Sequence, residues 1–130
     1  MRKASREMDS QWALEVMRRA PYITVSFTRV DGSAYGVPLS LACTSDDVWY
    51  FHCAPEGQKL DLIKQNNKVS FCVVGVTKPI AEQFTTLYES VISYGKADIN
   101  LSDEEKRKAL RLLVNKYSKG FEEIGEKYID

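Results

Sequence analysis

His52 is the only histidine of the chain, and it precedes Lys59 in the segment VWYFHCAPEGQKLDLIKQN at residues 48–66. The segment reads as a strand, a turn that contains proline and glycine, and a helix over about 58–65. A strand that enters a helix through glycine leaves free backbone N–H groups at the positive end of the helix dipole. Such a helix start can bind an anion, and a lysine beside it favours phosphate.

Both side chains also have plainer interpretations. His52 could act as a general acid or base or contact a cofactor, because the pKa of histidine lies near neutrality. It could equally be a strand-end residue held by a backbone carbonyl. Lys59 could bind phosphate, or it could be a solvated lysine on the helix surface.

A second polar group follows further along the chain, where hydroxyls recur at Thr85, Thr86, Ser90 and Ser93. Strand propensity alone explains the threonines, but serine is a poor strand former. A polar row along one strand would suit the phosphate or ribityl chain of a ligand. Glu89 in this row is either a carboxylate near that ligand or a charge that faces solvent.

Length and charge narrow the class of protein. A chain of 130 residues predicts one domain, spanning 1–130, that buries its core unaided. Lys+Arg and Asp+Glu both number 18 and no basic cluster is visible, which disfavours a nucleic-acid partner. No apolar run approaches the roughly 20 residues of a membrane span. The first residues lack the apolar middle of a signal peptide, so we expect a cytoplasmic protein.

The cysteines and the absent motifs exclude further classes. Cys43, Cys53 and Cys72 are far apart and accompany a single histidine, so we expect no metal site. We expect them to be buried small apolar residues in a reducing compartment, with Cys53 kept open as an exception because it neighbours His52. The chain contains neither a Walker loop, a G-x-G-x-x-G motif nor a G-x-S-x-G elbow, which disfavours the corresponding nucleotide-binding proteins and hydrolases.

Apolar alternation and turn signals predict strands over 22–28, 34–43, 48–53, 68–74 and 83–99, the last bent at Gly95. Asp31-Gly32 marks a hairpin turn, Pro38 places its strand at an edge or bend, and we expect a loop over 75–81. Helices are predicted over 11–19, about 58–65 and from Ser102. The resulting fold class is mainly β with peripheral helices (α+β), a small and mostly antiparallel β-barrel.

Ends of the predicted helices carry their own signals. Asp9 or Ser10 can cap the first helix, and the proline after Ala20 ends it. Ser102 and Glu105 form a capping box for the third helix, and Gly120 is its expected C-cap. The remaining tail could be helical or frayed.

Several segments together resemble a known family: Ala20-Pro21-Tyr22, Gly36-Val37-Pro38-Leu39, YFHCAPEGQKLDLIKQNNKVSF at 50–71, FTTLYESVISYGKA at 84–97 and DEEKRKALRLLVNKYS at 103–118. They resemble the 5-nitroimidazole-resistance (Nim) branch of the pyridoxamine-phosphate-oxidase-like, FMN-binding split barrels. The resemblance covers nearly the whole chain. Its core, H-x-A-x-E-G-x-K-x-D followed downstream by FTT-x-Y-x-S-V, is specific as a combination.

The resemblance implies a split-barrel homodimer with FMN at its interface and the isoalloxazine ring between the protomers. It implies that His52 lies near the reactive ring as the catalytic candidate, and that Lys59 binds the FMN phosphate. The remaining residues implied to contact the cofactor are Val37, Pro38 and Leu39 through their backbone, and Thr85, Thr86, Glu89 and Ser90. Relatives usually continue past the K-Y-I region into a further strand, whereas this sequence stops at Asp130.

The activity implied is the FMN-dependent reduction of small nitroaromatic compounds, with NAD(P)H as a possible electron donor. Two alternatives stay open, namely a haem-binding or haem-degrading protein with His52 as ligand, and a flavin-binding protein without turnover. Oxidation of pyridoxamine phosphate is less expected, because no arginine-rich site for the substrate phosphate is visible.

Overall fold

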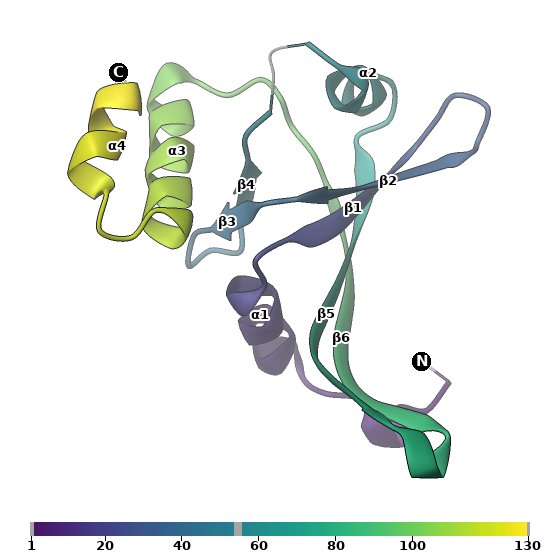
Figure 1. The fold of residues 1–130 in the computed structure, drawn as a ribbon. Helices are drawn as coiled ribbons and strands as arrows, with labels where there is room; N and C mark the ends of the chain where they lie inside the picture. Colours follow the sequence, from purple (N-terminus) through teal and green to yellow (C-terminus); the bar gives the residue numbers. More distant parts are fainter. Residues whose placement is uncertain (1, 54–55, 130) are drawn as a thin grey trace.

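The computed structural model describes residues 2–53 and 56–129. Its main sheet is antiparallel, has the strand order β2-β1-β5-β6, and consists of β1 (Ile23–Thr28), β2 (Ala34–Leu39), β5 (Lys68–Ile80) and β6 (Thr85–Lys96) (Figure 1). A second antiparallel pair joins β3 (Leu41–Cys43) to β4 (Trp49–Phe51). The helices are α1 (Ser10–Arg19), α2 (Gln58–Gln65), α3 (Asp103–Tyr117) and α4 (Glu122–Ile129), with short 3-10 turns η1 (Ala4–Arg6) and η2 (Ala81–Gln83). The predicted fold class, antiparallel β with peripheral helices, is confirmed.

One hydrophobic core lies between the two sheets and the first two helices. Alternate residues of β1, Ile23, Val25 and Phe27, point into it and are at most 2% exposed. They meet side chains from every neighbouring element, including Val16, Met17, Leu41, Leu62, Ile63, Val69, Val73 and Val91. Full burial of such side chains stabilises the fold by about 1.5–3 kcal/mol each. We call the sheet face that carries these residues the inner face.

Local signals set the helix starts as predicted. Asp9 caps α1 by accepting a hydrogen bond from the Trp12 N–H at 2.9 Å. Ser102 caps α3 by accepting one from the Glu105 N–H at 3.2 Å. The C-cap predicted at Gly120 is wrong, because α3 ends at Tyr117 with Ser118 as its C-cap, and Gly120 (φ 89°) lies in the link to α4. The tail that the sequence left open is helix α4. In the described part of the chain, no helix is long and apolar enough to cross a membrane.

The predicted strand over 34–43 is two strands in different sheets. β2 ends at Leu39 and β3 begins at Leu41, with Ser40 between them. β2 pairs with β1 at the edge of the main sheet, where Pro38 can be accommodated although it has no N–H to donate. The edge position predicted for Pro38 is therefore confirmed, while the continuous strand is wrong.

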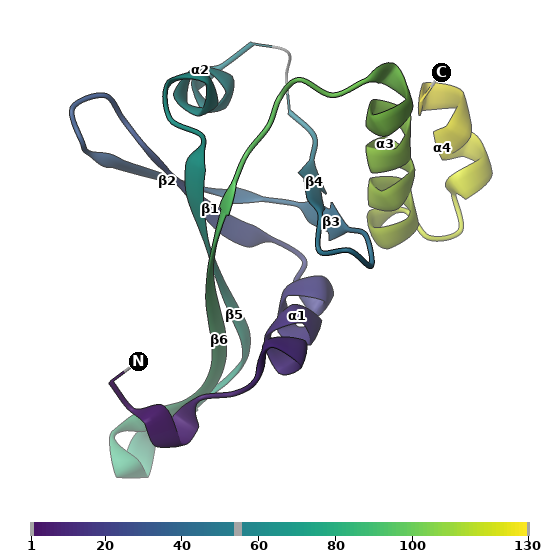
Figure 2. The ribbon, with the colours of Figure 1, turned by 180° about the vertical axis from the view of Figure 1, so that it is seen from behind.

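The predicted loop over 75–81 is also wrong, because β5 continues to Ile80 and pairs with β6 along its length. β6 in turn is shorter than the predicted 83–99. Beyond a register shift between Val74 and Thr77, the two strands form a hairpin that projects from the body of the molecule (Figures 1 and 2). We call residues 77–88 the arm. Phe84, with φ 51° and 97% exposed, lies in its turn.

The cysteines depart from expectation in one respect. Cys43 and Cys53 are half-buried, but Cys72 is exposed. Cys72 pairs with Thr24 and Ile92 on the face of the sheet opposite the core, which we call the outer face. The burial predicted for Cys72 is therefore wrong, because the prediction took no account of which face of its strand Cys72 would occupy.

Candidate functional site

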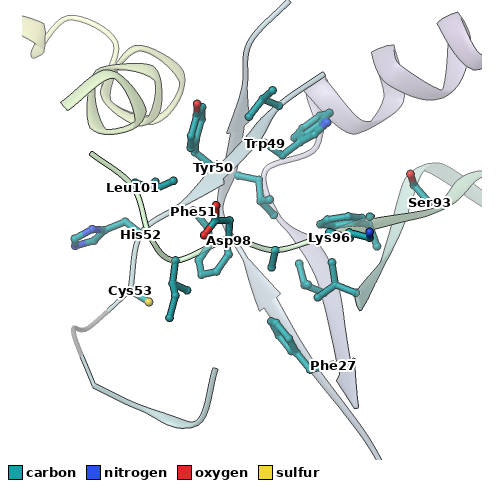
Figure 3. Close-up of a pocket in the computed structure, with 18 of the residues that line it drawn as sticks. Phe27, Trp49, Tyr50, Phe51, His52, Cys53, Ser93, Lys96, Asp98 and Leu101 are labelled. Atoms are coloured by element: carbon teal, nitrogen blue, oxygen red, sulfur yellow. The ribbon is translucent and has the colours of Figure 1, made fainter. Parts of the chain in front are cut away.

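His52 lies just beyond the end of β4, where regular pairing has stopped. Its side chain is exposed, and Figure 3 shows the imidazole directed away from the aromatic side chains of the same strand. Cys53 follows and is half-buried, while Pro55 of the predicted turn lies outside the described residues. The His52 side chain is therefore open to solvent and is not packed into the core.

Lys59 is the second residue of α2 and is half-buried, as predicted for a residue at the start of this helix. The helix begins after Gly57, whose φ of 150° is a conformation that favours glycine. Because glycine has no side chain, no side-chain hydrogen bond caps the start of the helix. The first intrahelical bond runs from the Asp61 N–H to the Gly57 carbonyl at 3.3 Å. The start of α2 therefore combines free backbone N–H groups with a lysine in its first turn, which are the features expected of a phosphate site.

A cavity of about 690 Å³ opens beside His52 (Figure 3). It lies between β4, the end of β6 and the segment that leads to α3, and aromatic side chains form much of its wall: Phe27, Trp49, Tyr50, Phe51 and Phe71. Cavities of this size and lining hold small organic ligands. The cavity therefore offers an apolar space next to the only histidine of the chain.

Tyr50 is the buried polar side chain in this wall. It is 7% exposed, and its hydroxyl donates to Glu105 Oε1 of α3 at 2.9 Å. Burial of the ring and, after it, the hydrogen bond to Glu105 raise the pKa of Tyr50 above its ordinary value. The phenol therefore stays protonated at neutral pH and ties α3 to β4.

The hydroxyl row does not gather at one place. Ser93 lines the cavity beside His52, whereas Thr85 and Thr86 lie at the far end of β6. Lys96 pairs with Lys68, the residue that begins β5 soon after α2, whereas Thr85 pairs with Ile80 at the other end of the same ladder. At about 3.3 Å per residue these ends are roughly 35–40 Å apart. Within a single subunit Thr85 and Thr86 lie on the arm, at the opposite side of the molecule from α2, which carries Lys59 (Figure 1).

Glu89 and Ser90 occupy opposite faces of β6. Ser90 is exposed on the outer face and pairs with Val74. Glu89 is on the inner face, where its Oε1 accepts from the Val76 N–H at 2.9 Å and its Oε2 lies 3.6 Å from Arg19 Nη2. The carboxylate of Glu89 thus already has partners within its own chain.

The three residues expected to approach the cofactor by their backbone lie along the edge strand β2. Leu39 is buried in the core and Val37 is half-buried against it, whereas Pro38 is exposed on the outer face opposite Thr24. Their backbone therefore lies at the rim of the outer face.

The exposed apolar side chains on the outer face of the main sheet were not predicted from the sequence. Val74, Ile92 and Tyr94 are 59%, 65% and 80% exposed there. The signal was present in β6, because its residues are apolar at consecutive positions, Val91 and Ile92, and a strand with one solvated face would alternate. The hydrogen bond between Tyr50 and Glu105 was also not predicted, because the two residues are far apart in the sequence and no local spacing indicates their contact.

Comparisons with known proteins agree with this architecture. A family model described as pyridoxamine 5'-phosphate oxidase matches residues 9–127. The crystal structure of a candidate 5-nitroimidazole antibiotic resistance protein from Bacteroides thetaiotaomicron is similar with 28% identity and a TM-score of 0.75, over 87% of this chain and 69% of that one. No curated protein matches the chain.

Two more distant structures share the fold. A flavocytochrome from Azotobacter vinelandii is 18% identical with a TM-score of 0.69, over 84% of this chain and 51% of its own. An FAD- and haem-binding protein from Mycobacterium smegmatis is 17% identical with a TM-score of 0.74, over 88% of this chain and 57% of its own. This chain spans little more than half the length of these two proteins. The fold is the split barrel that these neighbours share.

Proposed function

The chain belongs to the pyridoxamine 5'-phosphate oxidase-like family, and from this premise we propose that it is an FMN-binding flavoprotein that reduces small nitroaromatic compounds. The neighbour described as a 5-nitroimidazole antibiotic resistance protein supports the substrate class. The flavocytochrome and the FAD- and haem-binding protein support a flavin as cofactor. In this proposal FMN is the flavin, and NAD(P)H is the electron donor.

The observation that carries the proposal is the start of α2. Lys59 and the N–H groups after Gly57 form a cationic helix start that suits a phosphate dianion. His52 lies at the end of the strand that precedes this helix. A nucleotide phosphate held at α2 would therefore place the remainder of the molecule near His52 and the cavity.

A homodimer supplies the remaining predicted contacts. Thr85 and Thr86 are too far from Lys59 to hold the same small molecule within one subunit. The exposed apolar side chains Val74, Ile92 and Tyr94 need cover, since soluble proteins rarely expose a contiguous apolar patch of this kind. Two copies that pack by the outer face would bury these side chains and bring the hydroxyls of one subunit toward Lys59 of the other, with residues 37–39 beside the flavin ring. Glu89 remains a candidate near this ligand in the second subunit.

When bound, the flavin supplies the electron transfer, and the protein supplies binding, orientation and electrostatics. Lys59 neutralises the phosphate. His52 can hold or deliver a proton at a ring nitrogen beside the reacting atoms. The aromatic side chains in the cavity wall offer an apolar surface for an aromatic substrate.

The first test is the visible absorption spectrum of the purified protein, with mass identification of the molecule that heat releases. A flavin spectrum with FMN released supports the proposal. A Soret band instead would favour haem binding, a second candidate that the haem-binding neighbours keep open. A flavin that NAD(P)H does not reduce would favour a flavin-binding protein without turnover.

The phosphate assignment is tested by Lys59→Ala. We expect FMN affinity to fall by about 1–3 kcal/mol, or roughly 5- to 150-fold, because a charge-assisted contact is lost. Lys64→Ala is the matched control, since Lys64 is exposed in the last turn of the same helix. Equal affinities of the two variants, measured by fluorescence titration of FMN, would remove Lys59 from the site.

The role of His52 is tested by His52→Ala. We expect FMN binding to survive and the rate of flavin reduction or of nitro-group reduction to change, because the residue faces the reacting atoms without carrying the phosphate. Stopped-flow absorbance measures both rates. A variant that loses its fold and its flavin together would instead make His52 a structural residue.

A further inference from the structure

β5 and β6 lose their one-to-one pairing at a single place. Val74 pairs with Ser90 and Thr77 pairs with Tyr88, so Gly75 and Val76 of β5 face Glu89 alone. This two-against-one arrangement is a β-bulge, which bends its strand and increases the local twist. The bulge lies where the arm leaves the body, so its geometry sets the direction in which the arm projects (Figures 1 and 2).

Glu89 holds this bulge together. Its Oε1 accepts a hydrogen bond from the N–H of the bulged residue Val76 at 2.9 Å. A Cβ at Gly75 would lie 2.7 Å from the same oxygen and 3.2 Å from Val16 Cγ1. The carboxylate therefore occupies the space that only a glycine leaves free, between the bulge and helix α1.

Arg19 extends the contact to the end of α1. Its Nη2 lies 3.6 Å from Glu89 Oε2, and the two side chains are 56% and 26% exposed. An ion pair with this geometry and exposure contributes little. The hydrogen bond to the Val76 N–H is therefore the stronger part of the contact, and an uncharged side chain of the same shape can preserve it.

We propose that Glu89 is a positioning residue that sets the direction of the arm, and through it the placement of Thr85 and Thr86 against the second subunit. The inference rests on the proposed function, because the arm hydroxyls matter only if they reach a flavin phosphate across a dimer interface. Within that function it gives Glu89 a task that needs no direct contact with the cofactor. Gly75 and Val76 contribute to the same positioning, because Gly75 leaves room for the Glu89 carboxylate and the Val76 N–H donates to it.

The test compares Glu89→Ala with Glu89→Gln in the full chain. We expect Glu89→Ala to raise the exchange rate of the Val76 amide, measured by NMR, by about tenfold or more, because its acceptor is removed. We expect FMN affinity to fall roughly tenfold in the same variant, because the arm hydroxyls are displaced. Glu89→Gln should restore both quantities to within about threefold of the parent protein, since the amide oxygen can still accept.

Two controls separate positioning from general damage. Glu82→Ala removes an exposed carboxylate from the arm turn and should change neither quantity. Val114→Ala weakens the packing of α3 against Gly125 of α4, so it should lower the free energy of unfolding while FMN affinity stays unchanged. Loss of FMN affinity in all three alanine variants in proportion to lost stability would overturn the proposal.

Failure of the proposed function would be visible separately. If the parent protein binds no FMN, residual dipolar couplings of the arm amides in the parent protein and in Glu89→Ala still report the arm direction. A changed direction supports the positioning role of Glu89 without the flavin. An unchanged direction, or an unchanged exchange rate of the Val76 amide, overturns it.

Discussion

The two faces of the β5–β6 ladder are built from the same strands, but the inner face is buried and the outer face is exposed. On the inner face Val73 and Val91 are 4% and 8% exposed. On the outer face their direct neighbours in sequence, Val74 and Ile92, are 59% and 65% exposed. A strand with one solvated face alternates apolar and polar residues, whereas here large apolar side chains also lie on the exposed face.

This difference shows which part of the molecule one chain completes by itself. The inner face is covered by α1, α2 and the second sheet, which together form the core. On the outer face Ser70 is half-buried, and Cys72, Val74, Ser90, Ile92 and Tyr94 are all exposed in the described part of the chain. The homodimer proposed above would cover these exposed apolar side chains.

The largest expected effect comes from a charge on the inner face. Val91→Asp places an unpaired carboxylate in the core, so we expect the free energy of unfolding to fall by about 3 kcal/mol or more. Urea unfolding followed by circular dichroism measures the loss. Stability close to that of the parent protein would mean that the inner face is not the core.

An aspartate at the next residue, on the outer face, should affect association of the subunits and leave their folding intact. We expect Ile92→Asp to abolish the dimer, because it places two like charges in an apolar interface, while the fold of each subunit is preserved. Sedimentation velocity measures the mass and circular dichroism the secondary structure. A parent protein that is monomeric at every concentration, or an Ile92→Asp dimer of unchanged affinity, would contradict this use of the outer face.

A smaller effect is expected from loss of the hydrogen bond between Tyr50 of β4 and Glu105 of α3. Tyr50→Phe removes the hydrogen bond to Glu105 and should lower the free energy of unfolding by about 1 kcal/mol. Val48→Ala, at an exposed position just before the same strand, is a suitable control. Thermal unfolding at neutral pH measures the difference.

The same variant predicts a pH dependence. Because the pKa of Tyr50 is raised in the fold above its ordinary 10.0, the folded state keeps this proton to higher pH than the unfolded chain does. The stabilising contribution is therefore fully present below pH 10 and is lost as the pH rises through the folded pKa. We expect the parent protein to lose more stability than Tyr50→Phe above pH 10, and parallel curves would show that Tyr50 is not the group responsible.

The sequence by itself determined the features that depend on neighbours within a few residues. Asp31-Gly32 makes the hairpin turn, in which the Ser33 hydroxyl and N–H both donate to Asp31 Oδ1, at 2.6 and 2.9 Å. Ser102 and Glu105 begin α3, and Lys59 stands at the start of α2. The residues that could bind a flavin were likewise named from short motifs, and their assignment to a cofactor remains a prediction.

Only the tertiary structure decided where those residues lie relative to one another. Local signals indicated a loop from Gly75, but β5 and β6 remain paired beyond this residue. Glu89 on the opposite strand stabilises the bulge there by accepting a hydrogen bond from the Val76 N–H. That same long ladder separates Thr85 from Lys59 within a subunit. Such pairings join residues far apart in the chain and depend on what packs against each face of the sheet, which short-range spacing does not encode.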